Sequence, residues 1–338
     1  MIPLSVLDLA PIVEGSNAAE ALKNSLDLAQ HAEKFGYNRF WVAEHHNMDG
    51  VASSATSVLI GYLAAGTKTI RVGSGGVMLP NHAPLVIAEQ FGTLATLYPG
   101  RIDLGLGRAP GTDQMTMRAL RRTLATSGQQ GEDDFISDVI ELAEYFKPPP
   151  DQRRPANPVR AIPGIGCDVP IWLLGSSPYS AQVSAHLGLP FAFASHFAPG
   201  MLMQALEIYR ARFKPNGAEG ALTKPRAMVA ANVIVADTDA EANVLATSIQ
   251  QRFLGMQRGK RGPLPRPVPT MEGLWTESER YGVEEMMKIS AFGSPATARA
   301  KLEAIVRQTQ ADELIIAGAV HDHAARVRSY ELLARLSL

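Results

Sequence analysis

The sequence predicts an α/β protein, specifically a (β/α)8 TIM barrel, from three observations. Short apolar and β-branched runs alternate with amphipathic stretches almost from end to end. There are eight such runs, each followed by a helix-like segment, which is the element order of this barrel. The 338 residues are enough for one barrel, and we expect a single domain over residues 1–338. A doubly wound open sheet is the alternative, because local patterns do not show closure.

The predicted strands are short apolar runs bounded by polar or glycine-containing breaks. They cover residues 4–9, 39–43, 70–74, 102–106, 171–174, 191–194, 227–235 and 313–317. Two of the intervening helices have a clear apolar face. Residues 18–35 carry Leu22, Leu26 and Phe35 at helical spacing, and residues 85–97 form the second.

Two regions interrupt this alternation, and we expect insertions there. One follows the fourth predicted strand, at residues 109–131. The other, residues 255–282, is rich in glycine and proline and contains several arginines. Runs of this length are usually lids or binding loops, and plain surface disorder is the alternative for the second. A proline-rich run at 148–158 has the composition of a surface linker.

Residues 51–66 are rich in alanine, serine and glycine, which let helices approach closely. They predict a homodimer interface, although packing against the barrel would explain the same composition.

Composition excludes several classes of protein. The formal net charge of -1 gives no basic footprint for nucleic acid. The one cysteine, Cys167, permits neither an intrachain disulfide nor a cysteine cluster for a metal. The start of the chain has no signal-peptide pattern, and no apolar run reaches the 18 residues of a membrane span. We therefore expect a cytoplasmic protein without a membrane partner.

Titratable side chains follow the second predicted strand, at Glu44, His45 and His46. In a parallel α/β protein the carboxyl ends of the strands face the ligand, so these are candidate catalytic groups. Adjacent strand residues point to opposite faces, so His45 and His46 would not converge on one ion. We therefore expect no metal site.

Glycines and anion-binding groups follow the next three strands. Gly75 and Gly76 suit a close approach of a flat ring, with a simple bulge as the alternative. Gly107 leaves room before Arg108, whose fixed positive charge suits a phosphate or carboxylate. After Gly175, the residues Ser176, Ser177 and Ser180 enter a helix whose free N–H groups favour an anion. A well-capped helix alone would look similar, but together with Arg108 the pattern predicts a bound phosphate.

In their order and spacing, these motifs resemble the bacterial luciferase-like flavin-dependent monooxygenase family, in its single-chain, non-luminescent branch. The resemblance covers nearly the whole chain and is carried by residues 5–8, 43–47, 73–77, 100–108, 174–177 and 312–316. It implies a barrel that binds FMN at the carboxyl ends of its strands. It also implies a non-prolyl cis peptide at Gly75-Gly76 and an active-site histidine at His45, with Glu44 beside the flavin ring.

The same resemblance implies the reaction and its partners. Reduced FMN would come from a separate flavin reductase, a transient partner. It would react with O2 through a flavin C4a-peroxy intermediate to oxidise a small organic substrate. Two alternatives stay open: an oxidoreductase that transfers hydride with the deazaflavin F420, and a flavin-binding protein without catalysis.

Overall fold

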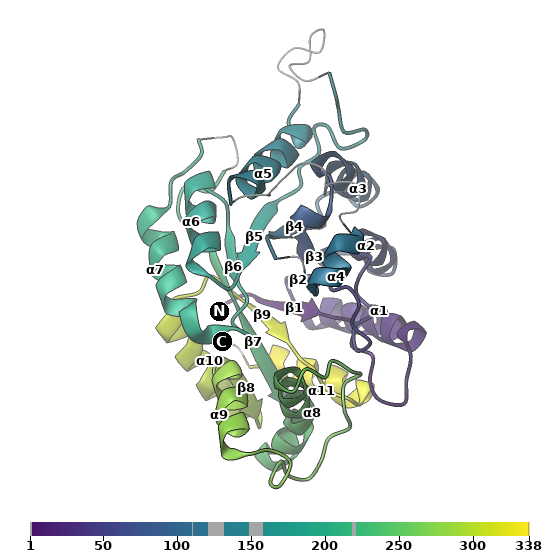
Figure 1. Cartoon of the computed structure of the whole chain (residues 1–338), viewed down its shortest axis with the longest axis vertical. Helices are drawn as coiled ribbons and strands as arrows, with labels where there is room; N and C mark the ends of the chain where they lie inside the picture. Colours follow the sequence, from purple (N-terminus) through teal and green to yellow (C-terminus); the bar gives the residue numbers. More distant parts are fainter. Residues whose placement is uncertain (1, 110, 121–131, 149–157, 218–220, 337) are drawn as a thin grey trace.

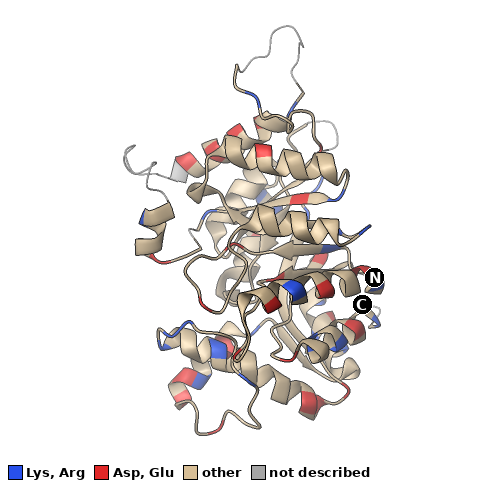
Figure 2. Cartoon of the chain, turned by 90° about the vertical axis from the view of Figure 1, so that its right-hand side faces the viewer, with Lys and Arg blue, Asp and Glu red and all other residues tan. Residues whose placement is uncertain are grey.

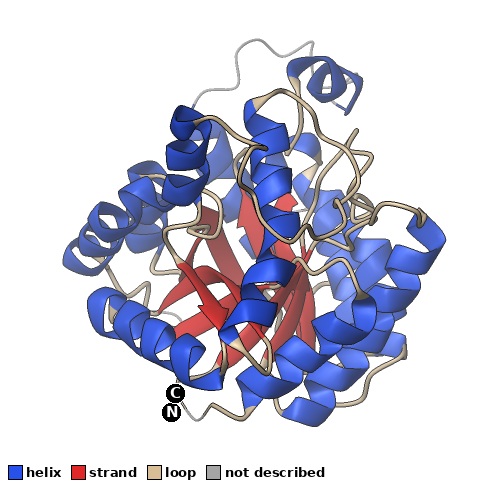
Figure 3. Ribbon diagram, turned by 90° about the horizontal axis from the view of Figure 1, so that it is seen from below, coloured by secondary structure: helices blue, strands red, loops and turns tan. Residues whose placement is uncertain are grey.

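The computed structural model describes residues 2–109, 111–120, 132–148, 158–217, 221–336 and 338. Eight parallel strands close into a barrel, because β1 pairs with β2 and β9, and β7 pairs with β6 and β9. Figure 3 shows these strands enclosed by helices. The predicted (β/α)8 barrel is therefore confirmed, and the open-sheet alternative is wrong.

The elements follow one another in the expected alternation (Figure 1). The strands are β1 (Leu4–Asp8), β2 (Arg39–Val42), β3 (Arg71–Met78), β4 (Ile102–Gly107), β5 (Ile171–Gly175), β6 (Phe191–Phe193), β7 (Ala227–Val235), β8 (Ser290–Gly293) and β9 (Glu313–Ala317). The helices are α1 (Ala18–Phe35), α2 (Thr56–Ala65), α3 (Pro84–Leu97), α4 (Gln114–Leu120), α5 (Glu132–Phe146), α6 (Pro178–Leu187), α7 (Leu202–Arg212), α8 (Asp239–Gln257), α9 (Glu277–Met286), α10 (Pro295–Thr309) and α11 (His323–Ala334), with single 3-10 turns at Leu79–Asn81 and Pro199–Met201.

Helix α1 has the predicted bounds because both ends are capped. The side chain of Asn17 accepts a hydrogen bond from the backbone N–H of Glu20 at 3.1 Å. At the other end Gly36 takes the left-handed conformation, with φ 83°, and ends the helix.

Two parts of the sheet differ from the sequence prediction. Strand β8 was not predicted, because only two of its four residues, Ala291 and Phe292, are apolar. It lies outside the barrel, paired with the second half of β7. Strand β3 continues four residues past Ser74, through the register shift between Ser74 and Val77. The expected cis peptide at Gly75-Gly76 is present inside this extension.

The two predicted insertions are present. After β4, residues 111–120 include α4, while residues 110 and 121–131 lie outside the described part of the chain. Most of the predicted linker, residues 149–157, also lies outside it.

The second insertion is neither fully irregular nor detached from the barrel. Its last residues belong to α9, which begins at Glu277 behind a capping box made by Thr276 and Glu279. In the preceding loop, Leu264 is buried and pairs with the segment before α1. Its N–H donates to the Ile12 carbonyl at 2.8 Å, and its carbonyl accepts from the Glu14 N–H at 3.0 Å. Surface disorder is therefore a wrong description of this loop, while a lid role stays a prediction.

Aromatic and charged side chains fill the amino-terminal half of the barrel. Trp41 and Trp172 meet edge to face at 5.5 Å between ring centroids, and the Arg39 guanidinium lies over both rings. Beneath them, the buried carboxylates of Asp103 and Glu313 both bind Arg39, at 2.6 and 2.8 Å. The open end of the barrel is therefore the carboxyl-terminal one.

The two ends of the chain lie together, joined by a hydrogen bond from the Ile2 N–H to the Leu338 carbonyl at 2.9 Å (Figure 1). Figure 2 shows acidic and basic residues interspersed over the helices in that view. None of the described helices has the length and apolar character needed to cross a membrane.

Candidate active site

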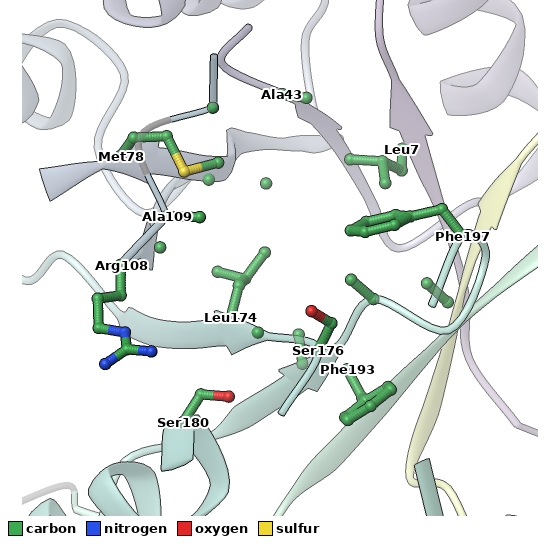
Figure 4. Close-up of a pocket in the computed structure, with 18 of the residues that line it drawn as sticks. Leu7, Ala43, Met78, Arg108, Ala109, Leu174, Ser176, Ser180, Phe193 and Phe197 are labelled. Carbon is green, nitrogen blue, oxygen red and sulfur yellow. The ribbon is translucent and has the colours of Figure 1, made fainter. Parts of the chain in front are cut away.

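A cavity of about 640 Å³ opens at the carboxyl ends of the barrel strands. Its walls are largely apolar and come from the barrel interior, with Leu7, Trp41, Phe193 and Ile315 among them. Figure 4 shows the polar side chains of Arg108 and Ser180 at one end of this space, and Leu7 and Phe197 at the opposite end. The site thus has a polar end and an apolar end.

The polar end joins the end of β4 to the start of α6. Ser177 is the N-cap of α6, and Pro178 follows at the first helical position. The Arg108 guanidinium lies over the ring of Tyr179, 4.2 Å from its centroid, so the arginine is held beside the first turn of this helix. Ser176, Ser177 and Ser180 line the same end of the cavity. Positive charge and helix N–H groups are the features that suit an anion such as a phosphate.

The predicted glycines line this cavity too, and packing explains two of them. At Gly175 an added Cβ would lie 2.0 Å from the Ser180 hydroxyl oxygen, so glycine lets α6 begin close to the end of β5. At Gly76 an added Cβ would lie 2.8 Å from the Gly105 carbonyl oxygen. Gly75 and Gly107 complete the set on the cavity wall.

His45 also lines the cavity. Its Nδ1 donates to the Gly111 carbonyl at 3.4 Å, so in the neutral ring Nε2 is the nitrogen that can accept a proton. Burial lowers the pKa of His45, and the positive charge of Arg252 lowers it further, against the opposing effect of the Gly111 hydrogen bond. The ring is therefore neutral at pH 7.

Glu44, the neighbouring candidate, is buried and is not among the residues that line the cavity. Its carboxylate accepts hydrogen bonds from Nε2 of His46 at 2.8 Å, Nε2 of His82 at 3.0 Å and the Met78 N–H at 2.9 Å. Burial would raise the pKa of Glu44, but the bonds from His82, His46 and Met78 together lower it. The carboxylate thus ties the end of β2 to the end of β3.

Sequence reasoning missed two residues of this site. Tyr179 positions Arg108, and the signal was an aromatic residue directly after the proline that opens α6. His196 lines the cavity three residues past the end of β6, a position analogous to that of His45. Its buried Nδ1 has no hydrogen-bond partner among the described residues, and burial lowers the pKa of this histidine to about 3.

Comparisons with known proteins find a family and relatives that match this chain. The family model described as "Luciferase-like monooxygenase" matches residues 2–331. A "Luciferase-like monooxygenase" of Escherichia coli (strain K12) is 59% identical over 331 residues, which are 98% of this chain and 96% of that protein. An N-acetyl-S-alkylcysteine monooxygenase of Bacillus subtilis (strain 168) is 44% identical over 219 residues, 64% of each chain.

Solved structures share the fold. The crystal structure of apo-MsnO8 is 36% identical, has a TM-score of 0.89, and covers 99% of this chain and 98% of its own. Two more distant structures show the fold alone. One is the FMN complex of the oxygenating constituent of 3,6-diketocamphane monooxygenase from Pseudomonas putida, at 18% identity, TM-score 0.71, and 99% and 97% coverage. The other is an F420-dependent secondary alcohol dehydrogenase with an F420-acetone adduct. It is 14% identical, has a TM-score of 0.67, and covers 98% of this chain and 97% of its own.

The match over almost the entire chain, with relatives of high identity, establishes that this protein belongs to the luciferase-like monooxygenase family.

Proposed function

We propose that this protein is a flavin-dependent monooxygenase that uses reduced FMN and O2 to oxidise a small organic substrate. The observation that carries the proposal is one cavity that joins a phosphate site, at Arg108 and the start of α6, to a neutral histidine, His45. The apolar space between them is of the size that buries cofactors and substrates, about 300–1,000 Å³ in general.

The residues present fit the parts of FMN. Arg108, the serines and the first turn of α6 would hold its phosphate, as charge-assisted donors do. The glycine backbone at Gly75 and Gly76 and the apolar barrel wall would face its flat ring. When bound, reduced FMN supplies the electrons that activate O2, so that one oxygen atom enters the substrate and the other leaves as water.

The protein contributes exclusion of water and control of one proton. Apolar walls of Leu7, Trp41 and Ile315 keep bulk water from the reacting atoms. His45, held by the Gly111 carbonyl, would accept a proton at Nε2 and return it, while the buried Glu44 carboxylate fixes the strand end that carries the histidine.

FMN is favoured over F420 by the pattern of similarity. The relatives with 59% and 44% identity are described as monooxygenases, whereas the F420-dependent structure is 14% identical. A flavin-binding protein without catalysis would have no use for a neutral histidine on the cavity wall, which supports an enzyme.

We also propose a compartment, a partner and an oligomeric state for the enzyme. It would act in the cytoplasm, where a separate flavin reductase supplies reduced FMN through a transient encounter. It would also form a homodimer through residues 51–66. In this segment the buried Ala64 packs inward, but Val58 and Tyr62 of α2 remain 73% and 43% exposed, and Leu97 of α3 is exposed as well. These exposed apolar side chains support an interface with a second copy.

Titration tests the cofactor and turnover tests the reaction. We expect FMN to bind and its flavin fluorescence to be quenched on binding. F420 should bind at least about tenfold more weakly. Mixing with reduced FMN, O2 and thioether substrates should give an oxygenated product that incorporates label from ¹⁸O2. Tight F420 binding with no response to FMN would contradict the proposal. FMN binding without any substrate-dependent oxygen incorporation would favour the non-catalytic alternative.

A further inference from the structure

Arg252, on α8, is a half-buried cation without a counter-charge. Within the described part of the chain its guanidinium makes no hydrogen bond and no ion pair, and burial lowers its pKa. The two fully buried arginines of the described chain are paired with carboxylates: Arg39 binds Asp103 and Glu313, and Arg326 binds Asp8 at 2.8 Å. An unpaired cation removed from water is unfavourable, so its presence calls for a ligand that supplies the negative charge.

Arg252 is electrostatically coupled to two histidines, His45 and His196. Burial lowers the pKa of His196, and the neighbouring titratable groups of His45 and Arg252 lower it further. Arg252 also lowers the pKa of His45. Both histidines line the main cavity, so the arginine is within electrostatic range of its wall. His196 adds a buried Nδ1 for which the described residues provide no partner.

A second cavity, of about 270 Å³, is basic. Arg252, Lys260 and Arg261 line it, and Glu14 is the one carboxylate among its described lining residues. An oxygen of Glu14 already accepts a hydrogen bond from the Arg266 N–H at 3.2 Å. Met48, Gly50 and Val51 also line this cavity, and they follow His45 closely along the chain.

We propose that the substrate is an organic acid, and that Arg252 selects it by binding its carboxylate. The apolar part of the acid, with the atom to be oxidised, would lie in the main cavity beside His45. Its carboxylate would reach between the two cavities to the guanidinium, whose planar fork matches a carboxylate in two parallel hydrogen bonds. This inference rests on the proposed function, because it assigns the substrate class of the same site.

Matched pairs of acids and amides test the inference by binding alone. The probes are N-acetyl-S-ethylcysteine, phenylthioacetic acid and hexanoic acid, each compared with its primary carboxamide by calorimetry on the protein with and without FMN. At least one acid should bind about tenfold or more tightly than its amide, the ratio expected for charge-assisted hydrogen bonds. Arg252→Gln should abolish this preference, and Arg252→Lys should retain part of it.

The preference is the ratio of the affinities of one variant for an acid and for its amide. A general loss of stability affects both affinities equally and cancels in this ratio. Arg335→Gln is the matched control, because this exposed arginine on the end of α11 pairs only with Glu331 in the described chain, and it should leave the ratio unchanged. The inference is overturned if none of the acids is preferred over its amide, or if Arg252→Gln keeps the preference.

Flavin affinity separates this failure from failure of the proposed function. FMN should bind equally to wild type and Arg252→Gln, because its phosphate belongs at Arg108. A wild type that does not bind FMN contradicts the proposed function, whatever the acid preference shows. If Arg252→Gln weakens FMN binding and not acid binding, Arg252 holds the flavin phosphate and the inference is wrong.

Discussion

Two neighbouring residues at the end of β2 have separate tasks. Glu44 points into the protein, where His46, His82 and the Met78 N–H satisfy its carboxylate. His45 lines the cavity and is held by one carbonyl, that of Gly111. The alternation of side chains along an extended chain predicts this division, because adjacent residues face opposite sides. We infer that the carboxylate is a positioning group, which leaves the histidine as the candidate catalytic residue.

Replacing His45 should therefore damage chemistry and spare cofactor binding. We expect His45→Ala to keep the Kd for FMN within about threefold and to lower the oxidation rate by about 100-fold or more, the usual effect of losing an acid–base group. His186→Gln, an exposed histidine on α6, is the control. A His45→Ala enzyme with full turnover would rule out the assigned role.

The pH profile provides a second readout of His45. Burial lowers the pKa of His45 below the ordinary histidine pKa, and the neutral ring predominates at every pH above this lowered pKa. Activity that needs the neutral ring should fall as the pH drops through the pKa of His45. Arg252→Gln removes a positive charge that lowers this pKa, so the acidic limb should move to higher pH. An unchanged acidic limb would argue against electrostatic coupling of the two residues.

At the scale of elements, one carboxylate clamps α1 to the turn before β3. Glu33 accepts hydrogen bonds from the N–H groups of Lys68, Thr69 and Ile70. Partial burial alone would raise its pKa, but these three bonds and the Thr69 hydroxyl lower the pKa to about 2. The clamp is therefore strongest when the carboxylate is charged.

The depressed pKa predicts the direction of a pH effect on stability. The contribution of Glu33 is complete above its unfolded value, near 4.5, and is lost as pH falls toward about 2. Glu33→Gln should lower the free energy of unfolding by about 1 kcal/mol at pH 7, and by progressively less in acid. Urea unfolding at several pH values checks this, with the exposed Glu303→Gln as control. An equal loss at pH 7 and pH 3 would contradict the assignment.

Element prediction succeeded where the pattern is local and strong. Seven of the barrel strands lie within about two residues of their predicted ends, because each is an apolar run with a polar break. Glycine at Gly75 and Gly76 hid the second half of β3, since glycine disfavours strands in general. Strand β8 was missed because its stability comes from pairing with β7, a partner more than 50 residues away in the chain.

The site was predictable where its residues follow strands and not elsewhere. His45, Arg108 and the serines of α6 stand directly after strand ends, which the barrel brings to one rim. Arg252 lies in the body of α8, among other polar helical residues, and nothing local distinguishes it from a solvated side chain. Its lack of a counter-charge is visible only once the fold surrounds it.

At the scale of the whole molecule, a buried ionic network joins strands that are far apart in the sequence. Glu313 on β9 accepts from the Ser5 hydroxyl at 2.5 Å and from Arg39 at 2.8 Å, which links the last barrel strand to the first two. Arg39 continues the link to Asp103 on β4, which also binds Arg71 at 2.6 Å. Asp103 and Glu313 oppose the effect of burial and raise the pKa of Arg39. The network closes the amino-terminal end of the barrel.

Removing one charge from this network should destabilise the entire barrel. We expect Glu313→Gln to lower the free energy of unfolding by about 3–5 kcal/mol, because buried Arg39 and its neighbours lose a compensating charge. Glu303→Gln, on the exposed face of α10, should change it by less than about 0.5 kcal/mol. Urea unfolding measures both. A loss of under about 1 kcal/mol for Glu313→Gln would show that the network is not what closes the barrel.

The most direct test of the central claim compares FMN with riboflavin, which lacks the phosphate, on wild type and Arg108→Gln. If the phosphate binds between Arg108 and the start of α6, the substitution should weaken FMN by about 10- to 100-fold and leave riboflavin affinity unchanged. Arg335→Gln should alter neither. Equal FMN affinity in wild type and Arg108→Gln, or equal losses for both flavins, would contradict the account.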